Sequence, residues 1–158
     1  MYDVVIIGGG PAGASAAIIT AKAGKKTLVI DSDQSVTKRA WIDNHYGTEG
    51  ISGPDLVASG KRQAIKFGAE FVTAKATKIV AGDGSVSVET DGQSYEGSHV
   101  IVATGMFADL AEASGIATKP GTEPRIKTIV ECGADGRTNL AGVWAAGTIA
   151  GVSMHTII

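Results

Sequence analysis

The chain has 158 residues, a length that predicts one domain over residues 1–158. Its 14 basic and 16 acidic residues leave a net charge of −2, and only 5% of the residues are aromatic, which argues against a nucleic-acid partner. The single cysteine excludes an internal disulfide. Because no apolar stretch approaches the ~20 residues of a membrane helix, we expect a cytoplasmic protein that does not enter the membrane.

The chain opens with a short apolar segment that runs directly into a glycine-rich turn. Residues 4–7 predict a buried strand and are too short for a signal peptide. Gly8 makes the turn, Gly10 lets a pyrophosphate approach the backbone, and Gly13 lets the next helix sit tightly on the strand. Pro11 suits the first helical position, so we expect a helix whose N-terminus faces an anion.

The next strand ends in an acidic residue. Gly24 ends the helix, residues 25–30 predict the strand, and Asp31 follows eighteen residues after Gly13. A carboxylate at this position can hold both hydroxyls of a ribose and disfavours a 2′-phosphate. A glycine motif alone is a weak signal, but strand, turn, helix and acid together predict a dinucleotide site.

The middle of the chain alternates irregular and regular segments. Residues 32–40 and 41–53 predict irregular structure, a helix follows from Gly53 to Gly68, and residues 70–72 predict a strand. Three alternating segments separated by glycine turns predict a three-stranded antiparallel meander: residues 78–80, 85–89 and 94–96.

A uniformly apolar segment follows the meander. Residues 99–103 predict a strand inside the parallel sheet, ending at Thr104-Gly105. Residues 106–125 have the composition of a linker. The predicted fold is α/β and Rossmann-like, with a central parallel sheet, helices on both faces and the antiparallel meander.

Five segments together resemble the FAD-binding domain of thioredoxin reductases. They occur in the order of that family and span nearly the whole chain: residues 8–13, 51–56, 66–70, 102–105 and 138–147. The resemblance implies FAD as cofactor, with Asp31 on the adenosine ribose and the loop containing Asn44 against the flavin. It also implies a pyridine nucleotide-disulfide oxidoreductase-like enzyme. The cofactor residues it predicts are Gly8, Gly10, Pro11, Ala12, Gly13, Asp31, Asn44, Ala76, Thr104, Gly105, Gly147 and Thr148.

Three departures from the family limit this resemblance. Only about thirty residues separate Gly105 from Thr138, so we expect no inserted NADPH domain. Cys132 stands alone, which excludes disulfide reduction by the Cys-x-x-Cys mechanism of the family. The second glycine motif reads Gly147-Thr148 where the family has Gly-Asp, which predicts weaker FAD binding. Because the chain ends a few residues into the last helix of the family, we expect the protein to continue beyond Ile158.

The sequence predicts no specific catalytic residue and no metal ligand. His45 and His155 are each open to two interpretations, as flavin neighbours or as ordinary histidines. Trp41 and Tyr46 are expected to cover the cofactor or to pack normally. We expect an FAD-dependent oxidoreductase or electron-transfer flavoprotein, reduced by NAD(P)H or a partner protein and assembled as a homodimer. The alternative is a non-catalytic regulatory module that binds FAD or NAD.

Overall fold

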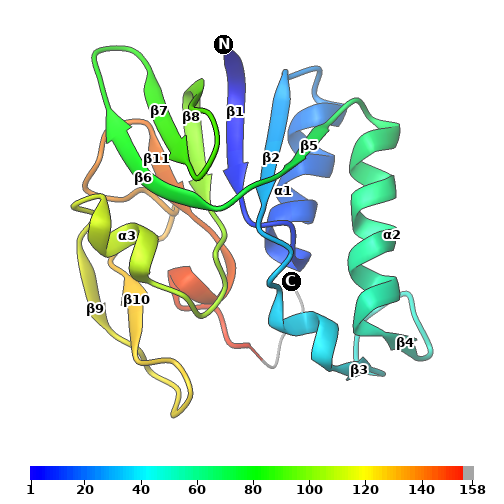
Figure 1. Cartoon of the computed structure of the whole chain (residues 1–158). Coiled ribbons are helices and arrows are strands. Elements are labelled where there is room, and N and C mark those ends of the chain that lie inside the picture. Colours follow the sequence, from blue (N-terminus) through cyan, green and yellow to red (C-terminus); the bar gives the residue numbers. More distant parts are fainter. Residues whose placement is uncertain (155–158) are drawn as a thin grey trace.

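The structure, a computed structural model, describes residues 1–154 and is built on a seven-stranded sheet (Figure 1). The strand order is β5-β2-β1-β8-β7-β6, and β11 also pairs with β8. Strands β5, β2, β1, β8 and β11 run parallel, whereas β6, β7 and the start of β8 form the antiparallel meander. The strand bounds are β1 (Tyr2–Ile7), β2 (Thr27–Asp31), β5 (Glu70–Thr73), β6 (Ala76–Ala81), β7 (Val86–Thr90), β8 (Tyr95–Val102) and β11 (Val143–Ala145).

The two faces of the sheet are covered by different elements, because successive side chains of a strand point to opposite sides. Val4 and Ile6 of β1 face helices α1 (Pro11–Lys22) and α2 (Gly53–Lys66). Val5 and Ile7 face the opposite core, which is closed by the meander and by the short helix α3 (Asp109–Ala113). Helices therefore lie on both faces, which confirms the predicted fold class.

The third strand of the predicted meander is continuous with the predicted parallel strand. Strand β8 pairs antiparallel with β7 over its first residues, and the same strand pairs parallel with β1 as far as Val102. A Cβ on Gly97 would lie 2.9 Å from Val5 Cγ2, so this residue lets the two strands approach where the pairing changes.

Two segments predicted as irregular or linker-like contain regular elements. The segment after β2 holds a 3₁₀ helix η1 (Val36–Arg39) and a two-stranded hairpin of β3 (Trp41–Ile42) and β4 (Ile51–Ser52). The interpretation of residues 106–125 as a linker is wrong, because they hold α3 and β9 (Thr118–Pro120), which pairs with β10 (Thr128–Val130). The side chain of Asn139 fixes this region by accepting from Ala117 N at 2.8 Å and donating to Gly115 O at 3.1 Å.

The last described element is a 3₁₀ helix, η2 (Gly147–Ala150), which follows β11. It contacts β10 on one side and the start of α1 on the other. Within residues 1–154, no helix is both long enough and apolar enough to span a membrane.

Candidate cofactor site

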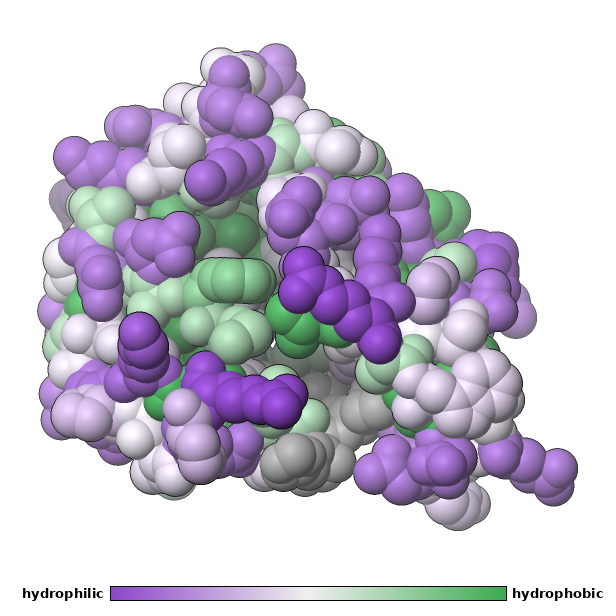
Figure 2. Space-filling view, turned by 60° about the horizontal axis from the view of Figure 1, so that its bottom comes forward, coloured by the Kyte–Doolittle hydropathy of each residue, from purple (hydrophilic) through white to green (hydrophobic). Residues whose placement is uncertain are grey.

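A cavity of about 730 Å³ opens at the carboxyl ends of the central parallel strands. Figure 2 shows it as a hollow with apolar walls and hydrophilic side chains around its rim. This is the edge of a parallel sheet at which α/β domains bind ligands. Ten of the twelve predicted cofactor residues line it: Gly8, Gly10, Pro11, Ala12, Asp31, Ala76, Thr104, Gly105, Gly147 and Thr148.

Gly13 does not line the cavity, but it holds the turn that does. A Cβ on Gly13 would lie 1.8 Å from the carbonyl oxygen of Gly8, so no larger residue fits without moving the backbone. Gly8 itself has a φ of +111°, and a Cβ there would lie 2.2 Å from Ala103 O. The turn therefore fits between α1 and β8 only as glycine.

The N-terminus of α1 opens toward the cavity. Gly10 is the N-cap and supplies no side-chain acceptor, Pro11 occupies the first turn, and that turn has no acidic residue. The first N–H groups of the helix and its partial positive charge are therefore available to an anionic ligand. Gly147 of η2 closes the opposite wall, where an added Cβ would lie 2.6 Å from Ala12 Cβ.

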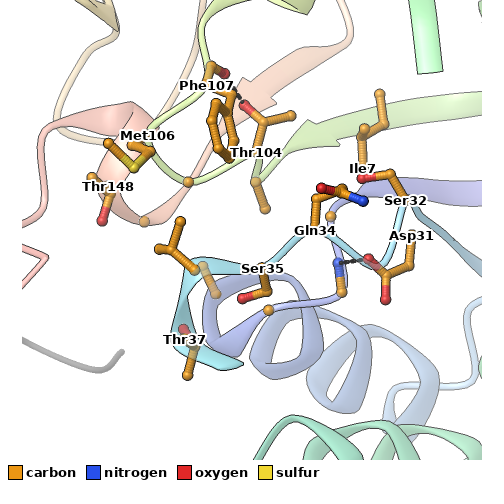
Figure 3. Close-up of a pocket in the computed structure, with 18 of the residues that line it drawn as sticks. Ile7, Asp31, Ser32, Gln34, Ser35, Thr37, Thr104, Met106, Phe107 and Thr148 are labelled. Atoms are coloured by element: carbon orange, nitrogen blue, oxygen red, sulfur yellow. Dashed lines mark hydrogen bonds between the residues drawn. The ribbon is translucent and has the colours of Figure 1, made fainter. Parts of the chain in front are cut away.

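Asp31 stands at the end of β2 with one carboxylate oxygen held by the backbone. Its Oδ1 accepts from Gly9 N at 3.3 Å (Figure 3) and from Asp33 N at 3.0 Å. A Cβ on Gly9 would lie 2.4 Å from Oδ2, so a side chain at position 9 would displace the acid. This role of Gly9 was not predicted from the sequence, although the residue is the middle of a glycine triplet.

The loop after Asp31 is stabilised by an ion pair. Asp33 has a φ of +63° and pairs with the Lys38 ammonium. The hydrogen bond from Lys38 and its positive charge lower the pKa of the Asp33 carboxyl below its ordinary value. This loop places Ser35 and Thr37 on one side of the cavity, facing Thr104, Met106 and Phe107 (Figure 3).

The remaining wall is the connection between β5 and β6. Ala74 N donates to Asp31 O at 3.1 Å. Lys75 N donates to Asp91 Oδ1 at 3.0 Å, and Asp91 N donates to Lys75 O at 3.0 Å. Lys75 and Asp91 were not predicted at the site from the sequence, because they meet only through the pairing of β6 with β7.

The other candidate residues lie outside this cavity. Asn44 is not among the described residues that line it, and His45 lines a separate groove of about 110 Å³ between α1 and α2. Cys132 is half-buried, with its Sγ 3.9 Å from Ala150 O. His155 lies outside the described residues. Among the residues that are described, no three His, Cys, Asp or Glu side chains form a group that could hold a metal ion.

The residues present fit a dinucleotide. Gly8, Gly9 and Gly10 present backbone without side chains to the cavity, and the first turn of α1 has no side-chain cap. Asp31 Oδ2 is the carboxylate oxygen left for a ribose. A parallel sheet with these features defines the class of nucleotide-binding α/β oxidoreductase domains.

The chain belongs to the pyridine nucleotide-disulphide oxidoreductase family, whose sequence model matches residues 2–131. It is 43% identical over 110 residues to the thioredoxin reductase of Aquifex aeolicus, covering 66% of this chain and 34% of that protein. The thioredoxin reductase of Listeria monocytogenes is 35% identical over 108 residues, with the same coverage of each chain. The chain thus spans about a third of the length of the curated relatives it matches.

Solved structures of thioredoxin reductases are also similar to this chain. A thioredoxin reductase from Gloeobacter violaceus has a TM-score of 0.64 at 30% identity, covering 66% of this chain and 34% of that one. The atypical thioredoxin reductase TRi from Desulfovibrio vulgaris Hildenborough has a TM-score of 0.85 at 20% identity, covering 99% and 92%. The second likeness shows the fold alone, and with the family match it confirms the thioredoxin-reductase-like FAD-domain fold predicted from the sequence.

Proposed function

We propose that this chain binds FAD and acts as an FAD-dependent oxidoreductase or electron-transfer flavoprotein. The observation that carries the proposal is the joining of the glycine turn to Asp31 at one cavity of about 730 Å³. The size lies within the usual range for cofactor pockets.

In this proposal, different parts of the cavity hold different parts of FAD. The α1 N-terminus and Gly10 would hold the pyrophosphate, and Asp31 would hold the adenosine ribose. Thr148, on the wall formed by η2, would donate to or accept from the ribityl chain. FAD, when bound, supplies two-electron acceptance, whereas the protein supplies orientation and electrostatics.

The source of electrons in this proposal is NAD(P)H in solution or a partner protein. Cys132 is the one cysteine in these 158 residues, so the sequence contains no dithiol to relay electrons to a disulfide. The reducing cytoplasm is the proposed location. A homodimer is the proposed assembly, because apolar surface exposed on a domain tends to be buried in a dimer.

One observation favours the non-catalytic alternative. The described residues that line the cavity include no histidine and no cysteine, so the cavity lacks the commonest protein acid-base and thiol groups. On that alternative, bound FAD or NAD would regulate association and would not turn over.

Anaerobic titration separates the two proposals. The FAD-loaded protein is mixed with NADH, with NADPH and with chemically reduced carrier proteins, and the flavin absorbance is followed. We expect bleaching by at least one physiological donor and recovery when an acceptor is added. A flavin that is reduced by dithionite but by none of these donors would favour the regulatory module.

A further inference from the structure

Two hairpins flank the mouth of the cofactor cavity. The β3–β4 hairpin starts beside Ala40, which lines the cavity and accepts a hydrogen bond of 2.8 Å from Gly53 N. Strand β10 of the β9–β10 hairpin packs against η2, the element that carries Thr148. Figure 1 shows the two hairpins at the same end of the molecule, on opposite sides.

The β3–β4 hairpin presents two aromatic side chains to solvent. Trp41 is 68% exposed and Tyr46 is 101% exposed. The Trp41 ring lies over Gly50, where an added Cβ would be 3.1 Å from the ring, whereas Tyr46 projects freely. Tyr and Trp are the residues that most often anchor protein interfaces, since they bury a large area at a low cost in conformational entropy.

The β9–β10 hairpin presents positive charge. Lys119, Arg125 and Lys127 are exposed, and no ion pair involves them within residues 1–154. Glu123 in the same loop is half-buried, with its Oε2 enclosed away from solvent. The three cations make this hairpin locally positive, whereas the whole chain has a net charge of −2.

Acidic residues are also exposed on the other hairpin. Asp43 and Glu49 are exposed on the β3–β4 side beside the exposed Arg39. On the β9–β10 side the three cations outnumber Glu123 and the exposed Glu131, so this side is the more positive of the two. A protein that docks across the mouth would place its own acidic groups on the β9–β10 side and an apolar patch on Trp41 and Tyr46.

We propose that this mouth surface, formed by Trp41, Tyr46, Lys119, Arg125 and Lys127, docks an acidic one-electron carrier protein that reduces the bound FAD. The proposal rests on the proposed FAD-binding function. Unpaired cations at the rim attract an acidic carrier by long-range steering, and the aromatic pair supplies the contact area once it arrives. Two reduced carriers each give up one electron, FAD takes two electrons and two protons to become FADH₂, and two oxidised carriers leave.

The test uses reduced plant-type [2Fe–2S] ferredoxin, a small acidic carrier, as the probe. The rate constant for FAD reduction is measured by anaerobic stopped flow at about 50 mM and about 500 mM salt. We expect it to fall about tenfold at the higher salt. R125E/K127E should lower the low-salt rate constant about tenfold and remove most of the salt dependence.

A matched control carries the same charge change at the other end of the sheet. Lys25 follows α1 and Lys66 ends α2. The carboxyl ends of both helices lie at the end of the molecule opposite the two hairpins (Figure 1), so K25E/K66E should change the rate constant about twofold or less. W41A/Y46A should lower the rate constant at both salt concentrations, because salt screens interactions between charges but does not weaken an apolar aromatic contact. All three variants should keep the FAD content and the dithionite reduction of the wild type.

The outcomes separate docking from cofactor binding. If the wild type binds FAD but ferredoxin reduces it slowly and without salt dependence, or if both charge variants behave alike, the docking proposal is overturned. If W41A/Y46A instead converts a wild-type dimer into monomers, the mouth surface is an interface between copies of this chain. If the wild type does not bind FAD, the proposed function fails and the docking proposal fails with it.

Discussion

The backbone N–H of Gly9 donates a hydrogen bond of 3.3 Å to Oδ1 of Asp31, which ties the glycine turn to the end of β2. The carboxylate is thus held in one orientation before any ligand arrives. Preorganisation of this kind lowers the cost of binding, because the side chain loses little further freedom.

Asp31→Asn should weaken FAD binding by about 10- to 100-fold, since a hydrogen bond to a charged group contributes roughly 1.5–3 kcal/mol. Fluorescence titration with FAD measures the loss. FMN has no adenosine, so its affinity should be unchanged in the same variant. Asp83→Asn, in an exposed turn, is the matched control. Equal losses for FAD and FMN would contradict the assignment of Asp31 to the adenosine ribose.

Gly13→Ala should destabilise the protein by about 3 kcal/mol or prevent folding, because its Cβ would lie 1.8 Å from Gly8 O. Chemical denaturation followed by circular dichroism gives the free energy of unfolding. Gly92→Ala is the control, since a Cβ there meets nothing closer than Thr90 Oγ1 at 3.7 Å. Two variants of equal stability would mean that α1 does not pack on the turn as described.

Thr148→Asp should tighten FAD binding about fivefold, which corresponds to about 1 kcal/mol for adding charge to the hydrogen bond. Thr148→Val should weaken it by a similar factor, because the hydroxyl is lost. Both affinities are measured by titration of the apoprotein. If Thr148→Asp weakened binding and Thr148→Val left it unchanged, the hydroxyl would not contact the cofactor.

Lys38→Met should raise the pKa of Asp33 toward its ordinary value of 3.8, because the hydrogen bond and the positive charge that lower it are removed. A lowered carboxyl pKa stabilises the folded loop above the ordinary pKa, and this stabilisation is lost as the pH falls through the lowered value. NMR titration of the Asp33 carboxyl carbon reads the shift directly. Lys78→Met should leave the titration unchanged, and an unchanged titration in Lys38→Met would refute the pairing.

The local parts of the fold and site were predictable, because each has a signal within a few residues. The turn from Gly8 to Gly13, the helix starting at Gly53 and the acid at Asp31 each combine a strand or helix boundary with a residue type that suits it. These elements lie where the sequence predicts them.

The parts that were missed depend on contacts between distant residues. Helix α3 has five residues and β9 has three. Elements this short do not show the repeat of apolar residues that identifies a helix or a strand in a sequence. Asp91 reaches the site only because β7 pairs with β6, and the role of Asn139 depends on a contact with Gly115. The place of Asn44 against a flavin remains a prediction from the family resemblance.

The most direct test is the absorbance spectrum of the purified protein before and after addition of FAD. The account predicts a yellow protein, or apoprotein that takes up FAD to one equivalent, with the flavin released on denaturation and binding weakened in Asp31→Asn. Colourless protein that binds no FAD at high micromolar concentration would contradict it.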